Sequence, residues 1–154
     1  MRRLATRSED GYSLAELLVV CAVIGIMAFL AIPFLTTYLP SASVTYAARE
    51  VQGSLNRAKL LAVATRQPIC VQIVAGGYQF LQGTCAGIPW TGPGTDGAGT
   101  FKMGAGLTLA QNTGVSPIFN QFGMATQTGS FKVTASGAPQ QTIWVNAGGR
   151  VWIQ

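Results

Sequence analysis

The chain has 154 residues, of which ten are Lys or Arg, five are Asp or Glu and none is His, for a formal net charge of +5. This length leaves room for one small domain beside a membrane-length segment. Beyond residue 16 the acids are Glu50 and Asp96, so general acid–base and triad catalysis lack a base. Without histidine or a Cys-x-x-Cys pair, a zinc site is not expected either. The composition therefore argues against an enzyme, a metal site and a cofactor.

The first 50 residues combine a basic leader with a long apolar run. Three arginines precede Gly11, and Glu16 is the last charge before Arg49. Residues 17–39 would form a helix of about 34 Å, which is long enough to cross a bilayer core. A secretory signal peptide has a shorter apolar core of ~7–15 residues. A plain signal anchor would fit the length, but it would not explain the glycine followed five residues later by an acid.

This arrangement resembles the class III signal and N-terminal helix of type IV pilins and pseudopilins, including the family's Gly25 and Pro33. The resemblance implies that a prepilin peptidase cuts after Gly11 and methylates Tyr12. Glu16 would then be the fifth residue after the cut and would act in filament assembly. Pro33 removes a backbone hydrogen bond and should kink or loosen the helix.

The same resemblance divides the chain into three parts. Residues 1–11 would be the leader, residues 12–43 the transmembrane and assembly half of a long helix, and residues 44–154 a globular domain. The protein would be a single-pass protein of the bacterial inner membrane with a periplasmic domain. Its partners would be the peptidase, the assembly platform in the inner membrane and other pilins or pseudopilins.

Residues 44–66 predict the amphipathic half of the helix. Apolar side chains recur every three or four residues, at Val44, Ala48, Val51, Leu55, Ala58 and Ala62, which is the stripe of a helix packed on a core. The opposite face carries Arg49, Gln52, Asn56, Lys59 and Arg66. The helix should end near Arg66, because Pro68 disfavours helical geometry at Gln67.

The remainder of the chain predicts short antiparallel strands separated by glycines. Residues 69–74 and 78–82 flank Ala75-Gly76-Gly77 as a hairpin. An irregular, mobile loop is expected over residues 83–99. Further strands are expected at residues 100–103, 107–110, 116–120, 130–135, 142–146 and 150–153. The fold class is therefore α+β, with a long N-terminal helix packed on a small antiparallel β domain.

Three cysteines remain. Cys21 lies in the apolar helix, where it acts as a small apolar residue. Cys70 and Cys85 flank the predicted hairpin and would face each other across a loop centred on Gly77 and Tyr78. A disulfide there, formed in an oxidising compartment, would close a loop of about 15 residues and contribute ~3 kcal/mol. Two unrelated thiols are the alternative, because a shift of one residue in register would separate them.

Several short motifs resemble the GspH/FimT subfamily of minor pseudopilins and minor pilins. They occupy residues 56–59, 66–70, 118–123 and 149–151. The resemblance implies a subunit of a type II secretion pseudopilus or of a type IV pilus, acting in filament assembly and thereby in protein secretion or pilus biogenesis. A membrane-anchored periplasmic domain without a filament is a weaker alternative.

A further alternative is a DNA-binding minor pilin for natural transformation. Some members of the subfamily bind DNA through a Gly-Arg-x-Arg motif, and here Trp152 replaces the second arginine of Gly149-Arg150-Val151-Trp152. If residues 147–149 form a three-residue loop, Trp144 lies opposite Trp152, and Arg150 shares their face. An aromatic pair beside a cation could stack bases and contact phosphate. The alternatives are tryptophans packed under a loop and an ordinary solvated arginine.

Overall fold

The computed structural model of the chain describes residues 13–154, apart from the side chains of residues 33–37. The predictions for Gly11 and Tyr12 lie outside the described residues. The chain divides into two compact units, with the boundary between Thr36 and Thr37.

The helix α1 (Leu14–Thr65) has 52 residues and contributes to both units. Its first part, Leu14–Ile32, is 19 residues long with a mean hydropathy of 2.7, and is long and apolar enough to cross a membrane. As predicted, the helix ends just before Arg66, whose φ of 52° is the left-handed conformation that closes many helices. The kink at Pro33 stays a prediction.

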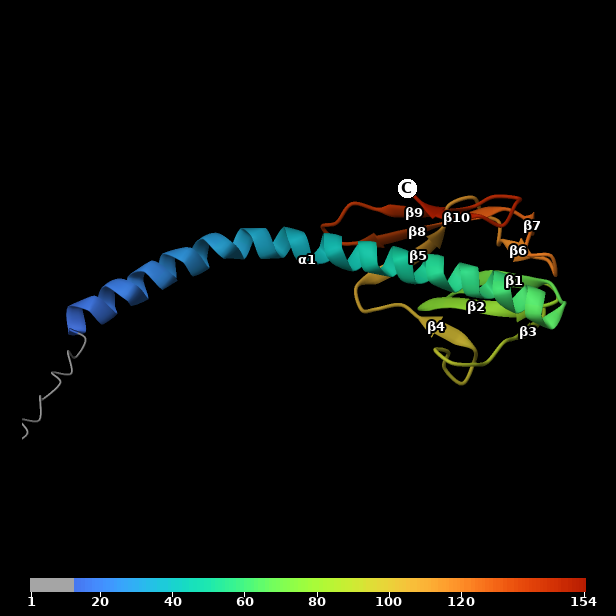
Figure 1. Ribbon diagram of the computed structural model, residues 1–154, viewed down its shortest axis with the longest axis horizontal. Coiled ribbons are helices and arrows are strands. Elements are labelled where there is room, and N and C mark those ends of the chain that lie inside the picture. Colours follow the sequence, from blue (N-terminus) through green and yellow to red (C-terminus); the bar gives the residue numbers. More distant parts are fainter. Residues whose placement is uncertain (1–12) are drawn as a thin grey trace, which may run out of the picture. The chain divides into compact units, whose positions relative to one another are not determined.

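The globular unit contains two antiparallel sheets (Figure 1). The first has the strand order β3-β2-β1-β6-β7 with β4 paired to β2, and consists of β1 (Ile69–Val74), β2 (Gly77–Gln82), β3 (Ile88–Pro89), β4 (Thr100–Lys102), β6 (Ile118–Phe119) and β7 (Ala125–Gln127). The second has the order β10-β9-β8-β5 and consists of β5 (Leu107–Gln111), β8 (Gly129–Ala135), β9 (Gln141–Val145) and β10 (Val151–Ile153). The predicted α+β class is confirmed. Sequence reasoning missed β7, and it missed β3 inside the predicted loop.

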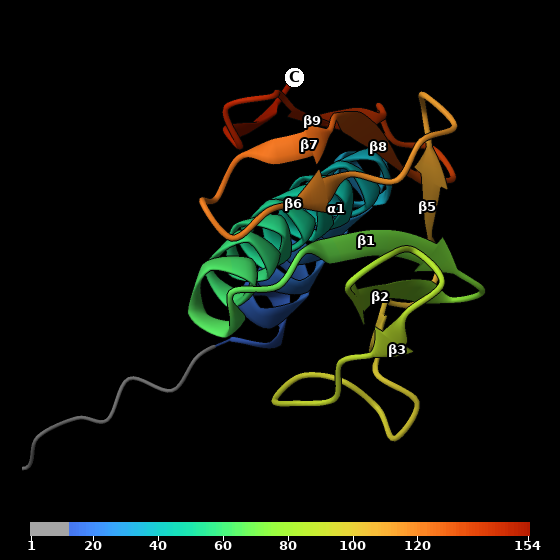
Figure 2. The same cartoon turned by 90° about the vertical axis from the view of Figure 1, so that its right-hand side faces the viewer.

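The two sheets cover two sides of the second half of α1 (Figure 2). The predicted apolar stripe is buried, and three of its six positions are alanines, which let the strands approach the helix closely. The sheets contribute larger side chains to the same core, among them Phe80, Phe119, Phe131 and Ile143. The helix is therefore the shared centre of the core, as expected.

Two side chains within one turn of α1 also bond to the β-rich part of the unit. Gln52 Nε2 donates to the Val151 carbonyl at 3.1 Å in the second sheet. Ser54 Oγ accepts a hydrogen bond of 2.6 Å from the hydroxyl of Tyr78 in the first sheet. Burial raises the pKa of this tyrosine. The helix is thus fixed to both sheets by polar as well as apolar contacts.

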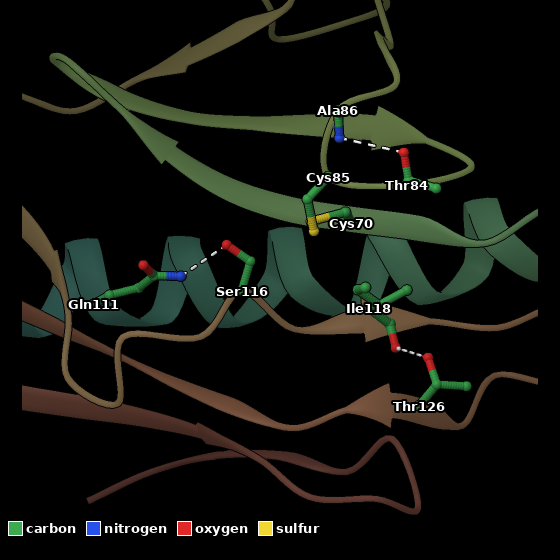
Figure 3. The surroundings of a disulfide bond; sticks show 8 residues. All are labelled: Cys70, Thr84, Cys85, Ala86, Gln111, Ser116, Ile118 and Thr126. Atoms are coloured by element: carbon green, nitrogen blue, oxygen red, sulfur yellow. Dashed lines mark hydrogen bonds between the residues drawn. A yellow bond between two sulfur atoms is a disulfide. The ribbon is translucent and has the colours of Figure 1, made fainter.

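The Cys70–Cys85 disulfide is present, but the register predicted for it is wrong (Figure 3). The β1–β2 turn contains two residues, because Val74 pairs with Gly77, and this places Cys70 opposite Leu81. Cys85 lies instead in the loop that joins β2 to β3, and its Cα is 5.1 Å from that of Cys70. The bond therefore fastens the β2–β3 loop to the neighbouring strand β1.

The rest of the predicted loop, residues 90–99, packs against the helix and the first sheet. The Arg57 guanidinium lies over the Trp90 ring at 4.9 Å, and its Nη1 donates to the Pro93 carbonyl at 2.8 Å. Trp90 in turn stacks on Phe101, with ring centroids 6.3 Å apart. An arginine of α1 therefore holds this glycine-rich segment in place.

Candidate functional site

Ser13 caps the N-terminus of α1. The Glu16 backbone N–H donates to Ser13 Oγ at 3.2 Å and to the Ser13 carbonyl at 3.0 Å. The spacing Ser-x-x-Glu is that of a capping box, and a carboxylate in the first turn is favoured by the helix dipole. Glu16 therefore lies at the start of the helix, as the sequence predicted. Sequence reasoning missed Ser13, although the Ser-x-x-Glu spacing could have revealed it.

The apolar part of α1 offers large hydrophobic side chains all around its circumference. Leu17, Leu18, Ile24 and Phe29 are among those at least 60% exposed, and the free Cys21 is also exposed. A helix that is apolar on every side is stable only when lipid or other protein surrounds it. We therefore expect lipid or other protein to surround this segment.

The C-terminal hairpin has the register predicted from the sequence. Trp144 pairs with Trp152, and Val145 pairs with Val151. The Asn146 N–H donates to the Arg150 carbonyl at 3.1 Å, which closes a three-residue loop. Val145 and Val151 point into the core, whereas the two tryptophans are half-buried on the other face.

The predicted DNA-contacting side chains lie on one face of the hairpin but line two different hollows. Asn146, Arg150 and Trp152 line one hollow of about 260 Å³. Trp144 lines a different hollow of about 210 Å³ with residues of neighbouring loops and of β8. The nearby Lys59 donates its Nζ to the Gly149 carbonyl at 3.2 Å, so this cation is already engaged within the domain.

The hairpin loop packs against the loop that joins β6 to β7. Gly149 lies against the Gly123 carbonyl, with which a Cβ at position 149 would collide. The Ala125 N–H donates to the Ala147 carbonyl at 3.0 Å. Gly149 has a φ of 71°, a conformation that glycine adopts without strain. The two loops therefore form one fixed surface at this end of the domain.

Asp96 shapes the segment that precedes β4. Its Oδ1 accepts from the Thr100 N–H at 2.9 Å and from the Ala98 N–H at 3.0 Å, and Lys102 Nζ lies 3.7 Å from its Oδ2. The Thr100 N–H contributes most to lowering the pKa of this carboxyl. In the part of the chain that the structure describes, no group of three His, Cys, Asp or Glu side chains could hold a metal ion. Asp96 thus acts in the structure of this loop.

Solved structures share this architecture. The minor pseudopilin EpsH from the type 2 secretion system of Vibrio cholerae superposes with a TM-score of 0.58 at 17% identity, over 73% of this chain and 96% of EpsH. The fold is that of minor pilins and pseudopilins. The type IV minor pilin FimU of Pseudomonas aeruginosa superposes with a TM-score of 0.51 at 18% identity, over 72% of this chain and 87% of FimU. No family model and no curated protein sequence matches the chain.

These similarities confirm the fold that the N-terminal and subfamily motifs predicted. At identities below 20% they establish the architecture of the chain, while its activity has to be argued from its own residues.

Proposed function

We propose that the chain is a minor subunit of a pilus-like filament. The observation that carries this proposal is a membrane-length apolar helix, Leu14–Ile32, that continues within α1 into the core of a domain with the minor-pilin fold. Before assembly the helix holds the subunit in the inner membrane, with its domain in the periplasm. In the filament, the apolar surface of the helix is covered by other pilin-like subunits.

The proposed maturation follows the predicted leader. A prepilin peptidase cuts after Gly11 and methylates Tyr12, which leaves Glu16 close to the new N-terminus. Intact-mass measurement of the protein from its own cells tests this step. The expected mass is that of residues 12–154 with one methyl group and the Cys70–Cys85 disulfide, and an N-terminus at any other residue contradicts it.

Glu16 is proposed to act in assembly. A carboxylate near the bilayer costs a few kcal/mol unless it finds a partner, and the proposed partner is the N-terminal amine of a neighbouring subunit. Glu16→Ala should leave membrane insertion intact and reduce the amount of the chain in purified filaments. Glu50→Ala, which removes an exposed acid from the second half of the same helix, is the matched control. Equal incorporation of both variants would reject this role for Glu16.

The resemblance to GspH/FimT motifs supports a proposed role in either protein secretion or pilus biogenesis. Deleting the gene separates these systems. Loss of a secreted protein with normal pili indicates a secretion pseudopilus, whereas loss of pili with normal secretion indicates a pilus.

DNA binding is a second candidate function, favoured by the hollow that Arg150 and Trp152 share. Full-length protein in detergent should bind labelled duplex DNA, and the affinity should fall as salt rises, because phosphate contacts release counterions. Arg150→Ala should weaken this binding more than Lys132→Ala, which removes a cation from β8. Absence of binding at low salt would leave the assembly role alone.

A further inference from the structure

The end of the domain at which α1 stops carries exposed apolar side chains that the core does not use. Leu60 is 67% exposed, Val63 is 44% exposed and Phe122 is 73% exposed. Arg66 joins them, because Val63, Arg66, Gln121 and Phe122 line a hollow of about 460 Å³. We call Leu60, Val63, Arg66 and Phe122 the helix-end patch. The loop between β6 and β7, which carries Phe122, lies beside the last turns of α1 (Figure 2).

The loop that presents Phe122 is held in one conformation. Asn120 Oδ1 accepts from the Phe122 N–H at 2.9 Å and from the Met124 N–H at 3.0 Å. Gly123 has a φ of 78° and lies so close to Lys59 and Val63 that an added Cβ would be 3.0 Å from the first and 3.5 Å from the second. The aromatic side chain is thus exposed on a fixed backbone, so binding a partner costs little ordering entropy.

The residue types fit a protein interface. Aromatic residues and arginine are enriched in interfaces, where the other charged residues are depleted. Apolar side chains that are grouped on a surface, as these are, mark binding sites more often than isolated ones do. The helix-end patch has both properties.

The charges around the helix-end patch indicate the chemistry of its partner. Lys59 and Arg150 lie on the adjoining turn and loop, and Arg66 lies within the patch itself. Glu50 precedes Leu60 by ten residues, about 15 Å along the helix, and Asp96 is paired with Lys102. Residues 37–154 contain seven basic and two acidic side chains. A second copy would therefore meet this surface with like charge, whereas an acidic protein would complement it.

We propose that the helix-end patch is the docking surface for a different protein subunit, one that places an apolar side chain against Phe122 inside a rim of carboxylates. The proposal rests on the proposed function, since it names a partner of the filament subunit. The apolar contact supplies the affinity, and the carboxylates facing Arg66 set the specificity and the rate of encounter.

A photo-crosslinking amino acid placed at Gln121, in the full chain and in its own cells, tests the proposal. Gln121 is exposed and borders the hollow. The same amino acid at Gln140, which is exposed between β8 and β9, is the control. We expect an adduct at position 121 and none at position 140. The cross-linked partner, identified by mass spectrometry, should be a different protein whose domain has a negative net charge.

Two substitutions then probe the patch in the cross-linking strain. Phe122→Ser and Arg66→Glu should each lower the adduct yield by about tenfold or more, as expected for interface anchors. Lys132→Glu makes the same charge change on the second sheet and should leave the yield unchanged. An unchanged melting midpoint of each variant shows that its fold is intact.

Several results would overturn the proposal. One is an adduct with a second copy of this chain, with a basic protein or with nucleic acid. Another is an equal adduct yield from positions 121 and 140, and a third is an adduct whose yield neither substitution lowers. Absence of an adduct in cells whose filaments contain the chain would also reject the patch while leaving the proposed function intact. A patch-dependent adduct in cells whose filaments lack the chain would support the patch and reject the filament role.

Discussion

Reduction of the Cys70–Cys85 disulfide should lower the free energy of unfolding of the globular unit by about 3 kcal/mol. The two cysteines are 15 residues apart in sequence, and in the chain-entropy model a loop of that length removes roughly 10 cal/mol/K from the unfolded chain. For a unit of this size the loss corresponds to a drop of roughly 10 °C in the melting midpoint. Because the bond fastens the loop before β3 to β1, amide exchange should accelerate first in that two-residue edge strand.

Thermal unfolding of the full chain in detergent measures this difference, with tryptophan fluorescence as the signal. All tryptophans lie in the globular unit, at Trp90, Trp144 and Trp152. Cys70→Ala/Cys85→Ala should melt at a lowered midpoint that reductant does not change. Cys21→Ala keeps the disulfide and should respond to reductant like the wild type. Equal midpoints for oxidised and fully reduced wild type, with reduction verified by mass, would refute the loop-closure argument.

Three further predictions concern the glycine-rich segments. Gly149→Ala combines backbone strain of about 1–2 kcal/mol with a collision against a facing carbonyl. Its free energy of unfolding should therefore fall further than that of Gly137→Ala, because Gly137 has a φ of 76° but open space around it. Equal losses in the two variants would contradict the described packing. Arg57→Ala should cost about 1–2 kcal/mol and speed proteolysis within residues 91–99, because a carbonyl hydrogen bond and the contact with Trp90 are lost; unchanged cleavage would contradict this. Asp96 has a lowered pKa in the folded state, so its stabilising effect is present above the unfolded pKa and disappears as pH falls through the folded pKa; an NMR titration of its carboxyl at the ordinary midpoint would contradict this.

Local signals account for the elements that the sequence predicted well. Pro68 excludes helical geometry from the residue before it, so the end of α1 was predictable. In the C-terminal hairpin, Gly148-Gly149 between two alternating apolar runs fixed both the loop and the pairing of Trp144 with Trp152. In contrast, β7 has two exposed polar residues among three and begins two residues after Gly123, so its sequence resembles a loop.

Tertiary packing decided the features that were missed. Either Gly76 or Gly77 could take a left-handed conformation, and only Gly76 does, with a φ of 80°. Gly77 is instead fitted against the backbone of Phe101, which sets the two-residue turn and the register of the disulfide. The exposure of Phe122 was not predicted from the sequence, because it depends on how Asn120 folds the loop.

The way α1 is bonded to both sheets has a mechanical consequence for a chain that is pulled from its N-terminal end. A tension applied to α1 at Thr37 cannot strip the strands away one at a time, because the bonds from Gln52 and Ser54 and the buried alanine stripe engage both sheets over the same few turns. To leave the domain, the helix would have to slide out from between the two sheets, and all of these contacts would break together. The domain should therefore rupture in a single step at high force rather than unravel gradually.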